Sequence, residues 1–343
     1  MSVRLEFGCL PTAIGSMPHT DPEEACSSVL KYLPDIPAWP QLPNRSAEES
    51  MYIQFSEGFP GTVINGDKIH IEPGDDFVAE LEQIYTDCEE SDASSYSVSA
   101  GYAAGLHTLL AKANKTRMVK GQIIGPITWG LTITDQDGQA ILYDETLAEV
   151  MAKFLRLKAS WQENALRRLS PNLIIFVDEP YLLSLGSVFV PVPEERVPAL
   201  LEEVLQGIKG VKGLHCCGNT NWSVLLNTSI DVLSFDAYNY TDSLSTYIDE
   251  VESFLARGSA IAWGIIPNDE DALAKESVSS LYERLGEAMA PFTRNGVSFK
   301  QIVSQGLLTP SCGLATLSTE AADRALELLA KLSNNIRRKY AVC

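Results

Sequence analysis

The sequence predicts an α/β fold in which parallel strands alternate with helices and close into a (β/α)8 TIM barrel. Short apolar runs of strand length alternate with segments of helical periodicity along the chain, which implies parallel strands joined by right-handed crossovers. Roughly eight such units fit into one domain that spans residues 1–343 and leaves room for an insertion. A doubly wound open sheet is the less favoured alternative, because no G-x-G-x-x-G pattern follows the first expected strand.

Each expected element follows from a local pattern. The run Leu173–Val177 is continuously apolar, as in a strand that is buried on both faces. Asp21 before Pro22 is typical of a helix start, and Ser46 followed by Glu49 has the pattern of a capping box. Residues 59–76 are rich in Gly, Pro and Asp, so we expect a small insertion there, after the second strand, with a hairpin-like piece at 68–71. The expected strands are 10–16, 37–42, 119–125, 173–177, 211–217, 232–236, 260–264 and 308–312; the expected helices begin near 21, 46 and 77 or span 99–113, 144–169, 193–208, 222–226, 244–255, 277–294 and 320–339.

The composition excludes several classes of protein. Hydrophobic residues make up 45% of the chain and charged residues 21%, as in ordinary soluble globular proteins. A formal net charge of −19 argues against nucleic acid and anionic membranes as partners. No apolar run reaches the roughly 18 residues of a membrane-spanning helix, and the first residues lack the apolar core of a secretory signal. Since the 7 cysteines are an odd number, we expect reduced thiols and a cytoplasmic location.

A histidine and two cysteines stand at the ends of expected strands. His215 and Cys217 are two residues apart, so on an extended strand both side chains point to the same side and make half of a tetrahedral zinc site. Cys312 ends a later strand, and the carboxyl ends of barrel strands meet on one face. Asp236 ends the strand between them as a further candidate ligand, whereas Cys216 is expected to be a core thiol. Each of these residues taken alone is more often a packing residue, but the combination predicts bound Zn²⁺.

Several motifs occur in the order that is found in one enzyme family. They are A-I-G-S at 13–16, K-G-Q-I-I-G-P at 120–126, V-D-E-P at 177–180, H-x-C at 215–217, D-V-L-S-F-D at 231–236 and P-S-C-G-L at 310–314. The chain therefore resembles the C-terminal catalytic barrel of cobalamin-independent methionine synthase, within the uroporphyrinogen decarboxylase-like superfamily. The resemblance implies a short, single-barrel methyltransferase of methionine biosynthesis.

The resemblance also implies roles for single residues. It makes His215, Cys217 and Cys312 zinc ligands, with Asp236 standing where the family has a glutamate ligand. It makes Asp178 a catalytic residue that, together with the backbone of Ile14, Gly15 and Ser16, binds the amino-acid part of a thiol substrate. The chemistry agrees, because a thiol bound to Zn²⁺ loses its proton near neutral pH and attacks a methyl group as a zinc thiolate.

Three departures from the family bear on the methyl donor and the thiol. The second barrel of the full synthase has no counterpart in the sequence. The turn W-G-I-I-P at 263–267 lacks the family histidine that helps to protonate a departing pterin, and W-P-Q-L-P at 39–43 lacks the glutamate that meets the substrate amine. A corrinoid departs without protonation. We therefore expect methylcobalamin or a corrinoid carrier protein as the donor, rather than methyl-tetrahydrofolate.

The expected acceptor is homocysteine, which gives methionine, and another thiol such as coenzyme M is left open. A uroporphyrinogen decarboxylase-like enzyme is an alternative, but it would need arginines at the strand ends, and the expected strand ends lack them. A non-catalytic module that binds zinc or a corrinoid protein is a further alternative, although it would need neither Asp178 nor the turn at Ser16.

Overall fold

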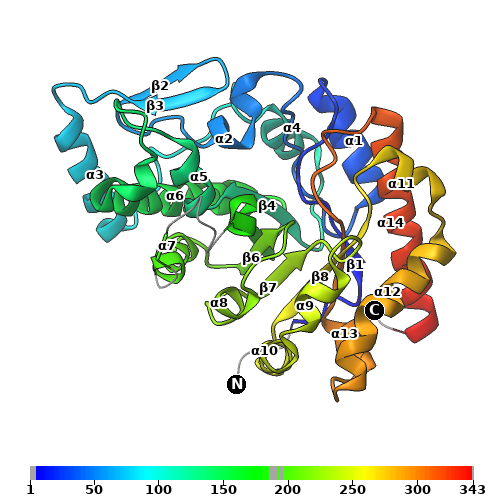
Figure 1. Cartoon of the computed structure of the whole chain (residues 1–343). Coiled ribbons are helices and arrows are strands. Elements are labelled where there is room, and N and C mark those ends of the chain that lie inside the picture. The colour runs from blue at the N-terminus through cyan, green and yellow to red at the C-terminus, as the bar shows by residue number, and fades with distance from the viewer. Residues whose placement is uncertain (1–4, 185–191, 194–195, 342–343) are drawn as a thin grey trace.

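A parallel sheet of seven strands forms the centre of the computed structural model, which describes residues 5–184, 192–193 and 196–341. The strand order is β1-β9-β8-β7-β6-β5-β4, and all neighbouring strands are parallel. The sheet curls, and helices pack around its outer side (Figure 1). Its strands are β1 (Leu10–Pro11), β4 (Val119–Ile124), β5 (Leu173–Asp178), β6 (Val211–Cys216), β7 (Val232–Phe235), β8 (Ala260–Ile266) and β9 (Leu307–Pro310).

The expected second strand, at 37–42, is the main difference from the sequence prediction. This segment pairs by single bridges, from Ala38 to Lys120 of β4 and from Gln41 to Ser16 beyond β1. Prolines at positions 37, 40 and 43 have no N–H group to donate, so a continuous ladder of hydrogen bonds cannot form. The α/β class and the curled parallel sheet are confirmed, whereas the eighth strand of the expected barrel is absent from the described sheet.

Of the two helix caps predicted from the sequence, the one at Asp21 is confirmed. Asp21 Oδ1 accepts a hydrogen bond of 2.7 Å from the Glu23 N–H at the start of α1, and Ser277 forms a capping box at the start of α12. The capping box expected at Ser46 is wrong, because its side chain caps nothing and only the 3₁₀ turn η1 follows. The expected helix 99–113 begins at Ala104, and the expected helix 244–255 is divided into α9 and α10.

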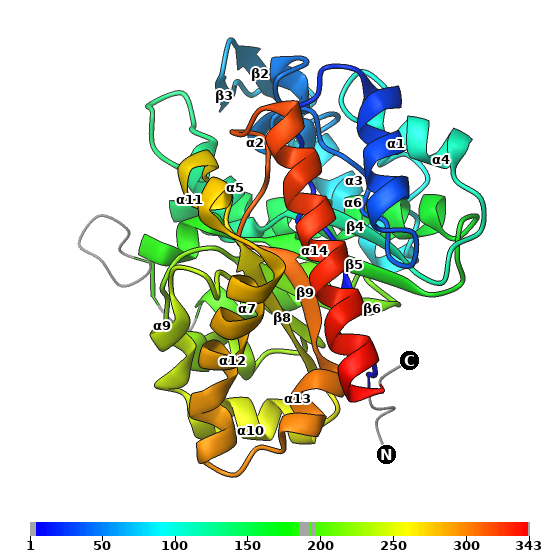
Figure 2. The same ribbon diagram turned by 90° about the vertical axis from the view of Figure 1, so that its right-hand side faces the viewer.

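The bounds of the helices complete the description, and residues 194–195 of the expected helix 193–208 lie outside the described residues. The helices are α1 (Pro22–Tyr32), α2 (Met51–Gln54), α3 (Phe77–Glu90), α4 (Ala104–Lys112), α5 (Pro126–Thr132), α6 (Glu145–Leu166), α7 (Arg196–Leu205), α8 (Trp222–Leu226), α9 (Thr241–Ser245), α10 (Ile248–Ala256), α11 (Glu270–Lys275), α12 (Val278–Arg294), α13 (Phe299–Gln305) and α14 (Thr319–Tyr340), with 3₁₀ turns η1 (Ala47–Glu49), η2 (Ile141–Tyr143) and η3 (Pro180–Ser184). Figure 2 shows α14 beside β9, with α1 packed against it. Within the described ranges, no helix combines the length and the apolar character needed to cross a membrane.

The insertion contains the expected hairpin. Strands β2 (Thr62–Asn65) and β3 (Lys68–Ile71) pair antiparallel, and Gly66 with a φ of 66° makes the tight turn between them. The hairpin stands apart from the central sheet, at the upper left of Figure 1.

Two hydrophobic clusters lie on the two faces of the curled sheet. In β5, Ile174 and Phe176 belong to the small inner cluster, while Ile175 and Val177 belong to the large cluster between sheet and helices. Because side chains alternate along a strand, Asp178 shares the inward face with Ile174 and Phe176. The carboxyl end of β5 therefore delivers a carboxylate to the inside of the curl.

Candidate metal and substrate site

Three potential metal ligands converge at the carboxyl ends of β6 and β9. One ring nitrogen of His215 and the Sγ atoms of Cys217 and Cys312 all lie within 4.8 Å of one another. These are the three residues expected from the sequence, His215 and Cys217 from their spacing and Cys312 from its place at the end of another strand. The predicted register is also confirmed, since Cys216 is fully buried in the outer cluster, with its Sγ 3.7 Å from the carbonyl oxygen of Gly218.

The imidazole of His215 is oriented as a metal ligand requires. Its Nδ1 lies 3.0 Å from Ser234 Oγ on the neighbouring strand β7, and its Nε2 is buried without a hydrogen-bond partner. Ligating histidines commonly donate their second ring N–H to such an oxygen, which fixes the tautomer and aims the other nitrogen. A buried nitrogen without a hydrogen-bond partner is unusual in proteins, so this atom suits the role of a metal ligand.

Cys217 and Cys312 shift each other's pKa in opposite directions. Interaction with Cys312, and to a smaller extent with His215, lowers the pKa of Cys217 against the opposing effect of burial. The same interaction with Cys217 raises the pKa of Cys312, and burial raises it further. The pair of thiols therefore favours a thiolate at Cys217, and a thiolate is the form of cysteine that binds a metal ion. A His, Cys, Cys donor set suits Zn²⁺.

Asp236 is not part of this group of ligand atoms. It follows β7, and its Oδ1 accepts a hydrogen bond of 2.8 Å from the backbone N–H of Asn239. Its Oδ2 accepts another of 2.8 Å from the Asn239 side chain, and burial raises the pKa of the carboxyl group. Direct ligation by Asp236 stays a prediction.

The metal ligands line a cavity of about 340 Å³ together with most of the expected substrate residues. Ile14, Ser16 and Asp178 all line it, although Asp178 is far from the other two in the sequence. Asp178 is 6% exposed, and its Oδ1 has no hydrogen-bond partner. Burial raises the pKa of this carboxyl group, and the charge of Lys120 opposes that shift. A buried carboxylate oxygen that faces a cavity without a partner suits a cationic group on a ligand.

Two glycines allow the turn at Ser16 to reach this place. A Cβ atom on Gly313 would lie 2.0 Å from Ser16 Oγ, so only glycine permits the hydroxyl to approach the loop after Cys312. Gly15 itself does not line the cavity. Its φ is 152°, and a Cβ there would lie 2.8 Å from side-chain atoms of both Gln41 and Gln122. Glycine at positions 15 and 313 is therefore required by the packing around the turn at Ser16.

Asn268 and Glu49 are two of the cavity-wall residues that the sequence did not indicate. Asn268 follows β8, and its Oδ1 accepts a hydrogen bond of 3.1 Å from Ser311 Oγ. Glu49 is fully buried, with Oε1 paired to Arg45 at 2.8 Å and Oε2 without a partner. Asn268 is the next residue after the W-G-I-I-P motif at 263–267, so it lies one residue beyond the turn in which the family has its histidine. For Glu49, the sequence pattern indicates only a helix cap.

Glu179, which neighbours Asp178, has a structural role. Its Oε1 accepts from the Ile127 N–H at 2.8 Å, and its Oε2 accepts from the N–H and Oγ1 of Thr128 at 2.8 and 2.6 Å. These bonds tie the end of β5 to the first turn of α5. A Cβ on Gly125 would lie 2.1 Å from the Glu179 carboxyl carbon, which explains glycine at that position.

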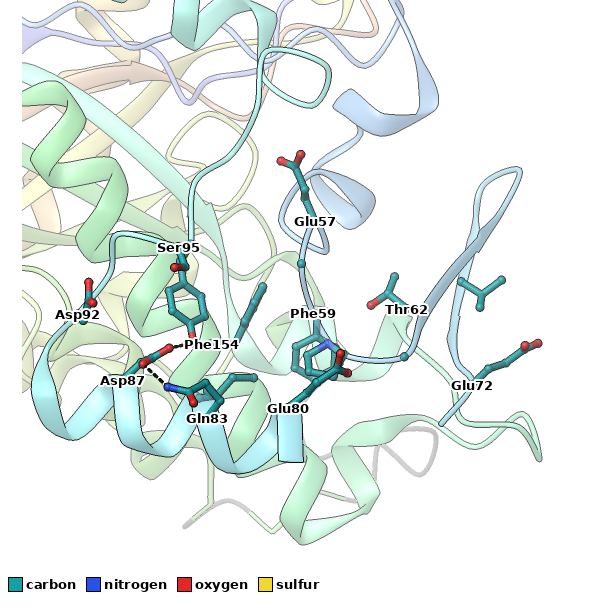
Figure 3. A pocket seen from close by; sticks show the side chains of 16 residues that line it. Glu57, Phe59, Thr62, Glu72, Glu80, Gln83, Asp87, Asp92, Ser95 and Phe154 are labelled. Carbon is teal, nitrogen blue, oxygen red and sulfur yellow. Dashed lines mark hydrogen bonds between the residues drawn. The ribbon is translucent and has the colours of Figure 1, made fainter. Parts of the chain in front are cut away.

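A larger cavity, of about 870 Å³, lies between the hairpin and α3 and contains none of the expected site residues. Figure 3 shows its acidic side chains, and several of them accept hydrogen bonds from other residues of the chain. Asp87 accepts hydrogen bonds from Tyr96 at 2.6 Å and Gln83 at 2.7 Å, and Glu57 accepts one of 2.7 Å from the Ser99 N–H. Size alone therefore does not identify the functional cavity.

Comparisons with known proteins bear on the fold. A scan against protein-family models finds no match, and a search of curated protein sequences finds none either. Among solved structures, a B12-independent methionine synthase from Shewanella sp. W3-18-1, in complex with selenomethionine, is similar with a TM-score of 0.65 and 16% identity, over 98% of this chain and 99% of that chain. These likenesses show the fold.

Two further solved structures agree. A putative vitamin-B12 independent methionine synthase from Listeria monocytogenes has a TM-score of 0.56 and 16% identity, over 92% of this chain and 86% of that one. A methyltransferase from Methanosarcina mazei has a TM-score of 0.52 and 11% identity, over 98% and 94%. The structural neighbours are thus methionine synthase-like proteins and a methyltransferase, which agrees with the motifs that the sequence carries.

Proposed function

We propose that this chain is a zinc-dependent methyltransferase that methylates the sulfur of an aminothiol, with homocysteine as the acceptor and methionine as the product. One observation carries the proposal. Three ligand atoms within 4.8 Å of one another line the same cavity as the unpartnered Oδ1 of Asp178. A substrate with its thiol at the metal and its ammonium group at the Asp178 carboxylate would engage both the metal site and this unpartnered oxygen. The fold shared with methionine synthase-like proteins supports this class of reaction.

His215, Cys217 and Cys312 would hold the Zn²⁺ ion, with the remaining position facing the cavity. When bound, zinc lowers the pKa of a coordinated thiol, so that the sulfur is a thiolate at neutral pH. The chain's own contribution is orientation and exclusion of water. Asp178 would accept hydrogen bonds from the substrate ammonium, and the hydroxyl and N–H groups of the turn at Ser16 would donate to the substrate carboxylate. Fixing both ends of the amino acid points the sulfur at the donor, which removes much of the entropic barrier to attack.

The charges of the cavity favour an aminothiol over the other candidate substrates. Among its described lining residues there is no lysine or arginine, whereas Asp178 and Glu49 each have a buried oxygen without a partner. A thiol with a sulfonate, such as coenzyme M, or a porphyrin with several carboxylates would bring more negative charge into this acidic cavity without a direct counter-charge. A thiol that carries an ammonium group brings the charge that the cavity lacks.

We propose a methyl-corrinoid, either free methylcobalamin or one presented by a carrier protein, as the methyl donor. A pterin leaving group needs a proton in or near the transition state. At the end of β8 the cavity offers the amide of Asn268, which donates a hydrogen bond but does not give up a proton. With a corrinoid, the sulfur–carbon bond forms as the cobalt–carbon bond breaks, and the electron pair of that bond stays on cobalt without any acid.

A paired assay tests the reaction and the donor. Zinc-loaded protein is given homocysteine with either methylcobalamin or methyl-tetrahydrofolate at equal concentration, and methionine is measured. We expect methionine from the corrinoid and little or none from the folate. Equal or greater turnover with the folate would contradict the choice of donor. No methionine from either donor, in protein that holds zinc, would favour a metal-binding module instead.

A further inference from the structure

Lys120 is a buried cation that the proposed reaction does not use. It lies in β4, is 0% exposed, and faces the inner cluster, where its Nζ lies 4.7 Å from the centroid of the Phe176 ring. Its Nζ donates a hydrogen bond of 2.6 Å to the carbonyl oxygen of Ile14 and one of 3.2 Å to Gln122 Oε1. Both acceptors are neutral, so the direct partners of Lys120 do not balance its charge.

Asp178 follows two residues after Phe176 in β5 and shares its inward face, so the charge of Lys120 acts on the Asp178 carboxylate. Burial lowers the pKa of the Lys120 ammonium group, and Asp178 is the group that raises it. Charged groups inside a protein are unfavourable unless they are compensated, and a buried ion pair is often replaceable by apolar residues without loss of stability. Stability alone therefore gives little reason for an ammonium group below the cavity.

The hydrogen bond to Ile14 connects the same ammonium group to the second half of the substrate site. Gly15 and Ser16 follow Ile14 directly, and Gly15 rests on Gln122, the other acceptor of Lys120. Gln122 is itself held by a hydrogen bond of 2.8 Å from its Nε2 to the carbonyl oxygen of Trp39. One buried cation thus supports the turn at Ser16 from below and provides the counter-charge to Asp178.

We propose that Lys120 is a positioning residue for the amino-acid substrate, which sets the turn at Ser16 for the substrate carboxylate and keeps Asp178 ready for the substrate ammonium. It touches neither the substrate nor the metal. This inference rests on the proposed function, because it presumes an amino-acid thiol in the cavity. It predicts that Lys120 determines the affinity for the amino-acid part of the substrate and leaves the metal site unchanged.

The chain provides a closely matched control in Lys158, on α6. Lys158 is 1% exposed, donates hydrogen bonds of 2.5 and 2.8 Å to the carbonyl oxygens of Glu57 and Ser97, and lies 5.1 Å from the Phe154 ring centroid. Glu57 and Phe154 line the other, larger cavity, as Figure 3 shows. Replacement of either lysine by methionine removes a buried ammonium group that lies over a phenylalanine ring. Only Lys120 lies next to the proposed substrate site.

The experiment compares wild type, Lys120→Met and Lys158→Met, all loaded with zinc, by metal analysis and by calorimetric titration with two thiols. Homocysteine carries both amino-acid groups, and 2-mercaptoethanol carries neither. We expect full zinc content in all three proteins. Homocysteine should bind Lys120→Met about tenfold to a hundredfold more weakly, while 2-mercaptoethanol binds as before, because charge-assisted contacts to the amino acid are lost. Lys158→Met should bind both thiols as wild type does. In turnover, Lys120→Met should raise KM for homocysteine with little change in kcat.

Several results would overturn the inference. One is an unchanged affinity of Lys120→Met for homocysteine. Another is a loss of affinity in Lys120→Met that is equal for homocysteine and 2-mercaptoethanol. A third is a loss of homocysteine affinity that is equal in Lys120→Met and Lys158→Met. If Lys120→Met does not fold, Lys120→Gln replaces it, since glutamine can still donate to Ile14 but carries no charge. We expect about a tenfold loss for homocysteine there, and wild-type affinity in Lys120→Gln would contradict the inference. Wild-type protein that binds zinc and 2-mercaptoethanol but not homocysteine would refute the proposed function, and the inference with it.

Discussion

Replacement of Asp178 by asparagine tests how the site recognises its substrate. The substitution removes one negative charge and preserves the shape of the side chain. Asp178 is 6% exposed and its Oδ1 has no partner, so a bound ammonium group would replace nothing but water there. A hydrogen bond to a charged group contributes about 1.5–3 kcal/mol. Since about 1.4 kcal/mol corresponds to a factor of ten, Kd for homocysteine should rise about tenfold to a hundredfold.

The assay is calorimetric titration of zinc-loaded protein above neutral pH, where the carboxyl group is ionised despite the burial that raises its pKa. The desamino analogue of homocysteine serves as the control ligand, because it presents the same thiol and carboxylate without the ammonium group. Asp178→Asn should bind the analogue as wild type does and should retain its zinc. If homocysteine binds both proteins equally, Asp178 does not meet an ammonium group, and the assignment of an aminothiol loses its support.

The remaining predictions concern stability. A Cβ at Gly105 in α4 would lie 1.9 Å from the Pro40 carbonyl oxygen, so Gly105→Ala should destabilise the fold by about 1–3 kcal/mol in chemical denaturation. Gly286 in α12 has open space around it, so Gly286→Ala should stabilise by roughly 0.5–1 kcal/mol, and a loss there would contradict the helix packing. Burial lowers the pKa of Lys158 from 10.5 to about 8, so between these values the unfolded chain holds a proton that the folded chain lacks. The stability of wild type relative to Lys158→Met should therefore rise with pH across this window, and parallel curves from denaturation at a series of pH values would refute the shift.

The part of the site that depends on local periodicity could be predicted from the sequence. His215 and Cys217 share a face because strand side chains alternate, and Cys216 faces the outer core for the same reason. Cys312 joins them because the carboxyl ends of parallel strands lie at one end of the sheet. Each of these placements follows from the geometry of strands and parallel sheets, without knowledge of individual side-chain contacts.

Contacts between distant segments could not be predicted in this way. The hydrogen bond from Lys120 to Ile14 joins residues of β4 and the first loop, and no local pattern marks it.

The expected strand at 37–42 failed because its prolines interrupt the ladder of hydrogen bonds, even though the segment lies where the strand was expected. The hydrogen bonds that both oxygens of Asp236 accept from Asn239, three residues later, were not expected either, and ligation of the metal by Asp236 stays a prediction.

Metal analysis of the reduced, purified protein tests the central claim most directly. We predict about one zinc per chain in wild type, from a donor set of one histidine and two cysteines that leaves one of four positions for substrate. Cys217→Ser and Cys312→Ser should each lose the metal, and Cys216→Ser, whose thiol is buried in the outer cluster, should retain it. Wild-type protein without zinc, or a Cys216→Ser variant that loses the metal while Cys217→Ser retains it, would contradict the account.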